Sequence, residues 1–198
     1  MSSLQRWVFI THPNVVIDAA VPVPRWPLSE EGRARMHAGL RQPWVTEVTA
    51  VHCSTEQKAI DGAAILAQHL GLAHTAHGAL GENDRSATGF LPPREFERVA
   101  DAFFAEPTVS VRGWERALDA QRRIVASVQA IDRSDMTQGT VAIVSHGAVG
   151  ALLRCWLAEQ PISRQWDQPA NGGGHWFAFT LEPRALLSPW CAIDHHGR

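Results

Sequence analysis

The sequence lacks tyrosine and has few cysteines and a single lysine. Its three cysteines are Cys53, Cys155 and Cys191. Because their number is odd, they lie far apart and no Cys-x-x-Cys pair occurs, we expect neither a disulfide framework nor a structural zinc site. Lys58 is the one lysine among 18 basic residues, so it stands out in a chain that otherwise uses arginine.

Long apolar runs and an excess of charge are also missing. No run approaches the ~20 apolar residues of a transmembrane helix. The formal net charge of −2 lacks the basic surplus of a dedicated nucleic-acid-binding protein. The segment Met1-Ser-Ser-Leu-Gln-Arg-Trp7 lacks the apolar core and cleavage site of a signal peptide. We therefore expect a cytoplasmic protein that binds neither nucleic acid nor membrane, and its oligomeric state cannot be read from the sequence.

What is present fits one globular domain. The chain has 198 residues, of which 45% are hydrophobic and 19% charged, and this length is enough to bury a sizeable core. No internal repeat or linker is visible. We expect residues 1–198 to form a single domain.

Strands and helices are predicted to alternate along the chain. Short apolar runs of β-favouring residues predict strands at 7–11, 45–53, 72–76, 140–145, 176–181 and 190–193. Helical spacing predicts helices at 29–40, between 54 and 71, at 94–105, at 114–131 and from 147 onward. The run at 140–145 is continuously apolar, as in a central parallel strand. The pattern predicts a three-layer α/β/α sandwich around a mostly parallel sheet.

Local signals mark some of the boundaries. Ser29 is a predicted N-cap, Ser54 and Gln57 have the spacing of a capping box, and Gly71 is a predicted C-cap. Residues 78–112 are expected to form an insertion or a lid over a site. Gly172-Gly-Gly174 precedes a predicted strand and not a helix, so we interpret it as a flexible connection and not as a phosphate loop.

Residues with reactive side chains follow the predicted strands. In open α/β sheets, ligands bind beyond the carboxyl ends of the strands. The residues expected at that edge are Thr11, His12, Lys58, Glu82, Asp84, Arg85 and His146. Two imidazoles, an ammonium group, a carboxylate and helix N-termini suit phosphoryl transfer better than metal binding, because no second carboxylate completes a ligand shell. A metal site at His195-His196 with His175 is an alternative, although a C-terminal tail is the simpler interpretation.

Four segments resemble the motifs of the histidine phosphatase superfamily, which is also called phosphoglycerate mutase-like. Thr11-His12-Pro13 corresponds to the family's Arg-His-Gly, and residues 53–59 correspond to its Ser-Ser-Pro-x-x-Arg-Ala. Leu80-Gly81-Glu82 corresponds to its Leu-x-Glu, and Ser145-His146-Gly147 to its Ser-His-Gly. The resemblance covers about residues 7–156, in the family's order.

The resemblance implies a phosphoglycerate mutase-like fold and a hydrolase of a phosphomonoester. His12 would attack the phosphorus and carry it as a phosphohistidine, and Glu82 would protonate the leaving oxygen. His146 would act with them as a catalytic residue and, with Lys58, would hold the phosphoryl oxygens. The family needs no metal or organic cofactor, and the implied ligand is a small phosphorylated molecule or phosphate.

The first two motifs depart from the family's pattern. Thr11 stands at a substrate-binding arginine position, and loss of such a donor typically costs ~3–4 kcal/mol. Lys58 replaces the second arginine and keeps the charge but not the bidentate geometry. Pro13 replaces glycine and has no N–H, although its carbonyl can still orient an imidazole N–H of His12. Arg25, in the proline-rich stretch 14–27, or Arg85 could restore a substrate-binding guanidinium, a hypothesis that rests on loop position.

Three functions stay open at this point. The first is the phosphatase, with hydrolysis favoured over mutase action because a mutase must exclude water and hold two phosphate positions. The second is a catalytically impaired member, a pseudoenzyme that binds an anionic ligand or a protein partner. The third is a site retuned for a less charged substrate. Thr11 and Pro13 motivate the last two. Asp84 is a rival to Glu82 as the acid, although it is more typical of a turn.

Overall fold

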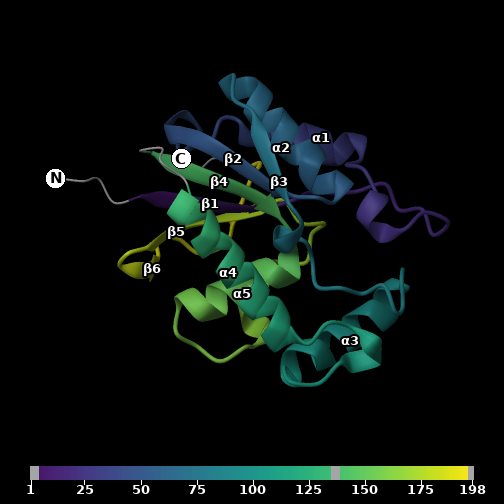
Figure 1. The fold of residues 1–198 in the computed structure, drawn as a ribbon. Helices are drawn as coiled ribbons and strands as arrows, with labels where there is room; N and C mark the ends of the chain where they lie inside the picture. Colours follow the sequence, from purple (N-terminus) through teal and green to yellow (C-terminus); the bar gives the residue numbers. More distant parts are fainter. Residues whose placement is uncertain (1–4, 135–138, 196–198) are drawn as a thin grey trace.

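The computed structural model describes residues 5–134 and 139–195. Its centre is a seven-stranded sheet with the order β3-β2-β4-β1-β5-β6, and β7 pairs with β5 (Figure 1). The strands are β1 (Arg6–Thr11), β2 (Val48–Ser54), β3 (His74–His77), β4 (Thr140–Ser145), β5 (His175–Leu181), β6 (Arg184–Leu186) and β7 (Cys191–Ala192). Strands β1 to β4 are parallel, whereas β5 runs antiparallel to β1. The mostly parallel sheet is confirmed, with an antiparallel extension at one edge.

Helices cover both faces of this sheet. Helices α1 (Glu30–Gly39) and α2 (Gln57–Leu70) lie on one face, and α4 (Ala117–Ser134) and α5 (Gly147–Leu157) lie on the other (Figure 1). Helix α3 (Pro93–Ala105) lies farther out, beyond α4 and α5. The predicted three-layer α/β/α arrangement is therefore confirmed. In the described ranges, no helix is both long and apolar enough to cross a membrane.

Strand β1 shows why the central runs are apolar throughout. Val8 and Ile10 belong to the core cluster under α1 and α2, whereas Trp7 and Phe9 belong to the cluster under α4 and α5. Side chains alternate between the two faces of a strand, and all four are fully buried. A strand covered on both faces has no solvent side on which to place polar residues.

Of the three predicted capping signals, two are confirmed and one is wrong. Ser29 caps α1 by accepting from the Gly32 N–H at 3.1 Å, and Gly71 ends α2 in a left-handed conformation. The capping box of Ser54 and Gln57 does not form. Ser54 ends β2, the N-cap is Glu56, and Gln57 is the first residue of α2. The reason is that the Ser54 hydroxyl already accepts from the Glu56 N–H, at 3.1 Å.

The glycine run leads into β5 as predicted, but it is packed tightly and is not a loose connection. Gly172, Gly173 and Gly174 all have positive φ. The Gly174 N–H donates to the carbonyl oxygen of His12 at 3.1 Å, and a Cβ at Gly173 would lie 2.3 Å from the same oxygen. The run therefore packs against the backbone just after β1, so closely that a side chain at Gly173 would not fit.

Phe9 offers a test of the packing beneath β1. Its ring is fully buried and stacks on Phe177 at 5.3 Å between centroids. A Phe9→Ala substitution should lower the free energy of unfolding by ~3–5 kcal/mol, measured by urea denaturation. The matched control Phe90→Ala, at a ring that is 38% exposed, should have a much smaller effect. Equal losses in the two variants would contradict this assignment of the core.

Candidate active site

Two histidines meet at the carboxyl edge of the sheet. Strands β1 and β4 pair in parallel, with Thr11 opposite Ser145, so the next residue of each strand is brought to the same place. The His12 N–H donates to the Ser145 carbonyl at 3.0 Å. The His12 and His146 rings face each other edge to face, with centroids 5.2 Å apart. The structure therefore brings together the two imidazoles that the sequence placed after separate strands.

His12 is held in one orientation by the residue that follows it. Its Nδ1–H donates to the Pro13 carbonyl oxygen at 2.9 Å, which leaves the lone pair on Nε2. Burial and the nearby Lys58 ammonium lower the His12 pKa to about 4. At neutral pH the ring is therefore uncharged, and Nε2 is an available nucleophile.

His146 is fully buried and also uncharged. Burial lowers its pKa well below the ordinary value. Its Nε2 lies 2.7 Å from Ser54 Oγ and 3.3 Å from a Glu56 carboxylate oxygen, while Nδ1 has no hydrogen-bond partner in the described chain. A carboxylate can only accept, so the single ring proton belongs on Nε2.

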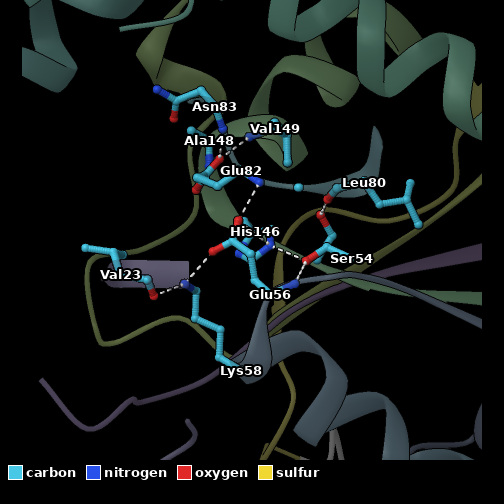
Figure 2. Close-up of polar contacts among 12 residues, drawn as sticks. Val23, Ser54, Glu56, Lys58, Leu80, Glu82, Asn83, His146, Ala148 and Val149 are labelled. Carbon is cyan, nitrogen blue, oxygen red and sulfur yellow. Dashed lines mark hydrogen bonds and ion pairs between the residues drawn. The ribbon is translucent and has the colours of Figure 1, made fainter. Parts of the chain in front are cut away.

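Glu56 is the centre of the polar network, and sequence reasoning missed it. Figure 2 shows its carboxylate between Lys58, His146 and the backbone of Glu82. It accepts from Lys58 Nζ at 2.5 Å and from the Glu82 N–H at 3.0 Å. Burial raises its pKa, but His146, Lys58 and these hydrogen bonds outweigh burial and lower the pKa to about 2. Glu56 occupies an unspecified position of the second motif, so no signal in the sequence marked it.

Lys58 points into the site, as predicted, but its charge is already paired. The side chain is nearly fully buried. Besides Glu56, its ammonium group donates to the Val23 carbonyl at 2.9 Å. Val23 lies in the loop that follows His12, so Lys58 also ties that loop to the site.

Glu82 lies at the N-terminus of α5. Its carboxylate accepts from the backbone N–H groups of Ala148 and Val149 at 3.3 and 3.1 Å (Figure 2). Its backbone carbonyl accepts from Arg123 at 3.1 Å. Burial raises the pKa of the Glu82 carboxyl, which favours the protonated form that a general acid requires. Asp84, its rival, is exposed and accepts from the Ser86 N–H, as a turn residue does.

The Thr11 hydroxyl forms its hydrogen bonds with other groups of the protein. It accepts from the His175 N–H at 2.9 Å and donates to Gln168 Oε1 at 2.6 Å. Thr11 is fully buried, and it is Gln168 that lines the cavity. The sequence had no signal for Gln168, because it lies in a loop far from every motif.

The two candidate arginines are placed differently. Arg85 stacks over Phe96 and Trp114, with its guanidinium carbon 5.1 and 5.7 Å from the ring centroids. Both rings line the cavity, so Arg85 lies close to the site. Burial is the largest cause of the lowered pKa values of His12 and His146, and the positive charge of Arg85 lowers both further. Arg25 is exposed, and within the described residues no ion pair or side-chain hydrogen bond joins it to the site.

A cavity of about 420 Å³ opens beside the imidazoles. Its lining joins the polar groups of the sheet edge to the apolar face of α3 and includes His12, Glu82, Gly147, Gln168, Phe96, Ala100, Phe103 and Trp114. The predicted lid therefore supplies one wall of the cavity. Among the described residues, no group of three or more histidine, cysteine or acidic side chains is arranged to hold a metal. His196 lies outside the described residues.

The environment of His12 predicts how its ring titrates. By NMR, the imidazole should titrate near pH 4, well below the ordinary 6.5. Lys58→Met should raise this pKa, because removing a neighbouring cation stabilises the imidazolium. Arg133→Met, which removes an exposed cation in the last turn of α4, is the matched control and should leave it unchanged. A His12 pKa near 6.5 in the wild type would contradict the effect of burial and of Lys58 on this ring.

The comparisons with solved structures agree with this architecture. Mycobacterial glucosyl-3-phosphoglycerate phosphatase, solved with inorganic phosphate, superposes with a TM-score of 0.79 at 20% identity, covering 97% of this chain and 100% of that one. Bacillus stearothermophilus YhfR gives 0.76 at 22% identity, covering 98% of each chain. Entamoeba histolytica phosphoserine phosphatase, in complex with 3-phosphoglyceric acid, gives 0.74 at 12% identity, covering 97% of this chain and 100% of that one.

Comparison of the sequence with known proteins gives a family match but no individual relative. No curated protein matches this chain. The family profile described as histidine phosphatase superfamily (branch 1) matches residues 23–184. Lys58, Glu82 and His146 lie inside this match, whereas His12 and its altered motif precede it. Since the match spans most of the sequence, this chain belongs to the histidine phosphatase superfamily.

Proposed function

We propose that this protein is a hydrolase of a phosphomonoester that works through a phosphohistidine on His12. The observation that carries the proposal is the neutral His12 ring, whose Nδ1–H is bound to the Pro13 carbonyl and whose Nε2 is left available, 5.2 Å from the ring of His146. The names of the solved relatives support the substrate class, because two of them are phosphatases of phosphomonoesters.

The first step transfers the phosphoryl group to the protein. The Nε2 lone pair of His12 forms a bond to phosphorus while the bond from phosphorus to the ester oxygen breaks. The leaving oxygen takes the proton of the Glu82 carboxyl group and departs as an alcohol. The raised pKa of Glu82 supports this role, because the proton must be present before the step begins.

The second step returns the protein to its starting state. Water attacks the phosphorus, its proton passes to the Glu82 carboxylate, and the bond between phosphorus and Nε2 breaks, which restores the lone pair of His12. In both steps His146 Nε2–H, Lys58 and the Arg85 guanidinium stabilise the charge on the phosphoryl oxygens. His146 and Lys58 both contact the Glu56 carboxylate, so in this mechanism a phosphoryl oxygen replaces that carboxylate as their acceptor.

The Glu56 carboxylate also favours a second function, binding of an anionic ligand without turnover. Glu56 already neutralises Lys58 and lies beside both His146 and the Glu82 backbone, where it repels an incoming dianion. This arrangement is expected of a member that binds an anionic ligand weakly, without turnover.

Turnover of a chromogenic phosphomonoester separates the two functions. The wild type should hydrolyse p-nitrophenyl phosphate with and without a chelator, and His12→Ala should lose ~10³-fold or more of the rate because the nucleophile is gone. His37→Ala, at an exposed histidine of α1, is the control and should keep full activity. Wild-type turnover that survives in His12→Ala would rule out the phosphohistidine. No wild-type turnover, with measurable binding of phosphate, would favour the binding protein.

The charge of Glu56 has a measurable consequence for phosphate binding. Glu56→Gln keeps the shape of the side chain and removes the negative charge beside His146 and Lys58, so inorganic phosphate should bind ~10-fold more tightly, measured by isothermal titration calorimetry. Glu47→Gln removes an exposed charge of the same sign and should change little. Unchanged or weaker binding in Glu56→Gln would show that Glu56 organises the cup, the group of polar side chains formed by His12, Lys58, Glu82 and His146, and does not oppose the anion.

A further inference from the structure

We propose that Gln168 is a ligand-binding residue whose amide N–H donates to a phosphoryl oxygen, and that Thr11 and His175 are the residues that position it. The inference takes one premise from the proposed function, namely that a phosphoryl oxygen binds beside His12. It adds a donor that lies outside every motif of the sequence.

The oxygen end of the Gln168 amide is anchored. Oε1 lies 2.6 Å from Thr11 Oγ1 and 3.2 Å from His175 Nδ1. The 2.6 Å distance is typical of an O–H···O hydrogen bond and short for N–H···O. The Thr11 hydroxyl also accepts from the His175 N–H at 2.9 Å. Of the two acceptors for its own proton, Gln168 Oε1 at 2.6 Å is much nearer than the His175 carbonyl oxygen at 3.3 Å. Both anchors are buried and hold the carbonyl oxygen toward the protein.

The nitrogen end is therefore turned toward the site. A Cβ at Gly147 would lie only 2.5 Å from Gln168 Nε2, so the amide nitrogen lies against the residue that follows His146. Gly147, Gln168 and His12 all line the same cavity. Within the described residues, Nε2 makes no hydrogen bond to the protein's own groups, and it is not one of the buried side-chain atoms left without a partner, so it is not buried. Its two N–H groups are thus available to a ligand.

The identity of residue 11 explains why an amide can occupy this place. The Thr11 side chain already touches Gln168 Oε1, so any longer side chain at position 11 would run into the amide. In the motif that Thr11-His12-Pro13 resembles, the corresponding residue is an arginine. Here a short hydroxyl side chain holds a neutral donor in the space that a longer side chain would enter. The site therefore gains a hydrogen bond to the ligand without gaining a positive charge.

Equilibrium binding of inorganic phosphate tests this role directly. Gln168→Met keeps the length of the side chain but removes the donor, and it should weaken phosphate binding ~10-fold or more, as expected for a lost hydrogen bond to a charged group. Thr11→Val, which removes the anchor, should also weaken binding. Thr11→Ser should restore it, because the serine hydroxyl can still donate to Oε1. Gln165→Met, at an exposed glutamine three residues away, is the matched control and should bind as the wild type does.

The outcomes separate this inference from the proposed function. Thermal unfolding of each variant distinguishes a lost contact from a lost fold, and the rescue by Thr11→Ser is a result that a purely structural role of residue 168 does not predict. Phosphate binding that depends on Gln168 in a protein without turnover would support the inference and refute the hydrolase. If the wild type turns over substrate and the folded Gln168→Met variant binds phosphate as tightly as the wild type, the hydrolase is supported and the inference is refuted. Absence of phosphate binding in the wild type would overturn the inference.

Discussion

The parallel pairing of β1 with β4 is the constraint on which the rest of the site depends. It aligns Thr11 with Ser145, so the chain leaves both strands at the same edge and the two imidazoles lie face to edge at 5.2 Å. The pairing is stable because both strands are buried on both faces. Each histidine then lies where its strand ends, and α5 begins directly after His146. The buried sheet lies behind the two rings and the cavity lies in front. That burial is also what keeps both rings uncharged.

The deeply buried charges of the site need partners. Lys58 and Glu56 form a buried ion pair at 2.5 Å, and such a pair is tolerated only when further hydrogen bonds satisfy both groups. The Val23 carbonyl and the Glu82 N–H supply them. Arg85 is treated differently, because its guanidinium lies over the faces of Phe96 and Trp114, where the aromatic rings attract a cation without cancelling its charge. Among the described residues no carboxylate forms an ion pair with Arg85, so on the proposed function its charge is available to a ligand.

The sequence predicts the framework of this fold better than the contents of its site. Apolar runs buried on two faces and helical spacing place β1, β4, α1, α2 and α5 to within a few residues, because those patterns reflect the core directly. The convergence of His12, Lys58, Glu82 and His146 also follows from the rule that strand ends share one edge. Glu56 and Gln168 were not predictable in this way. Their roles come from tertiary contacts with His146 and Thr11 across 90 residues or more, and neither occupies a patterned position. The capping box failed for a related reason, since the Ser54 hydroxyl is bound within the site itself.

The substitutions in the first two motifs form one consistent change. With Thr11 and Lys58 in place of two arginines, the cup has fewer guanidinium groups, and its remaining ammonium group is balanced by Glu56. Two unpaired guanidinium groups in so buried a place would depend on an anion for their stability, whereas here the Glu56 carboxylate already balances the Lys58 ammonium group. A ligand must therefore compete with an internal carboxylate for Lys58 and His146, and it gains neutral donors such as Gln168 in return. Such a balance penalises a dianion more than a monoanion, because each added negative charge is repelled by Glu56. On the proposed function, the same departures from the family's motifs are expected to favour a phosphoryl ligand of lower charge.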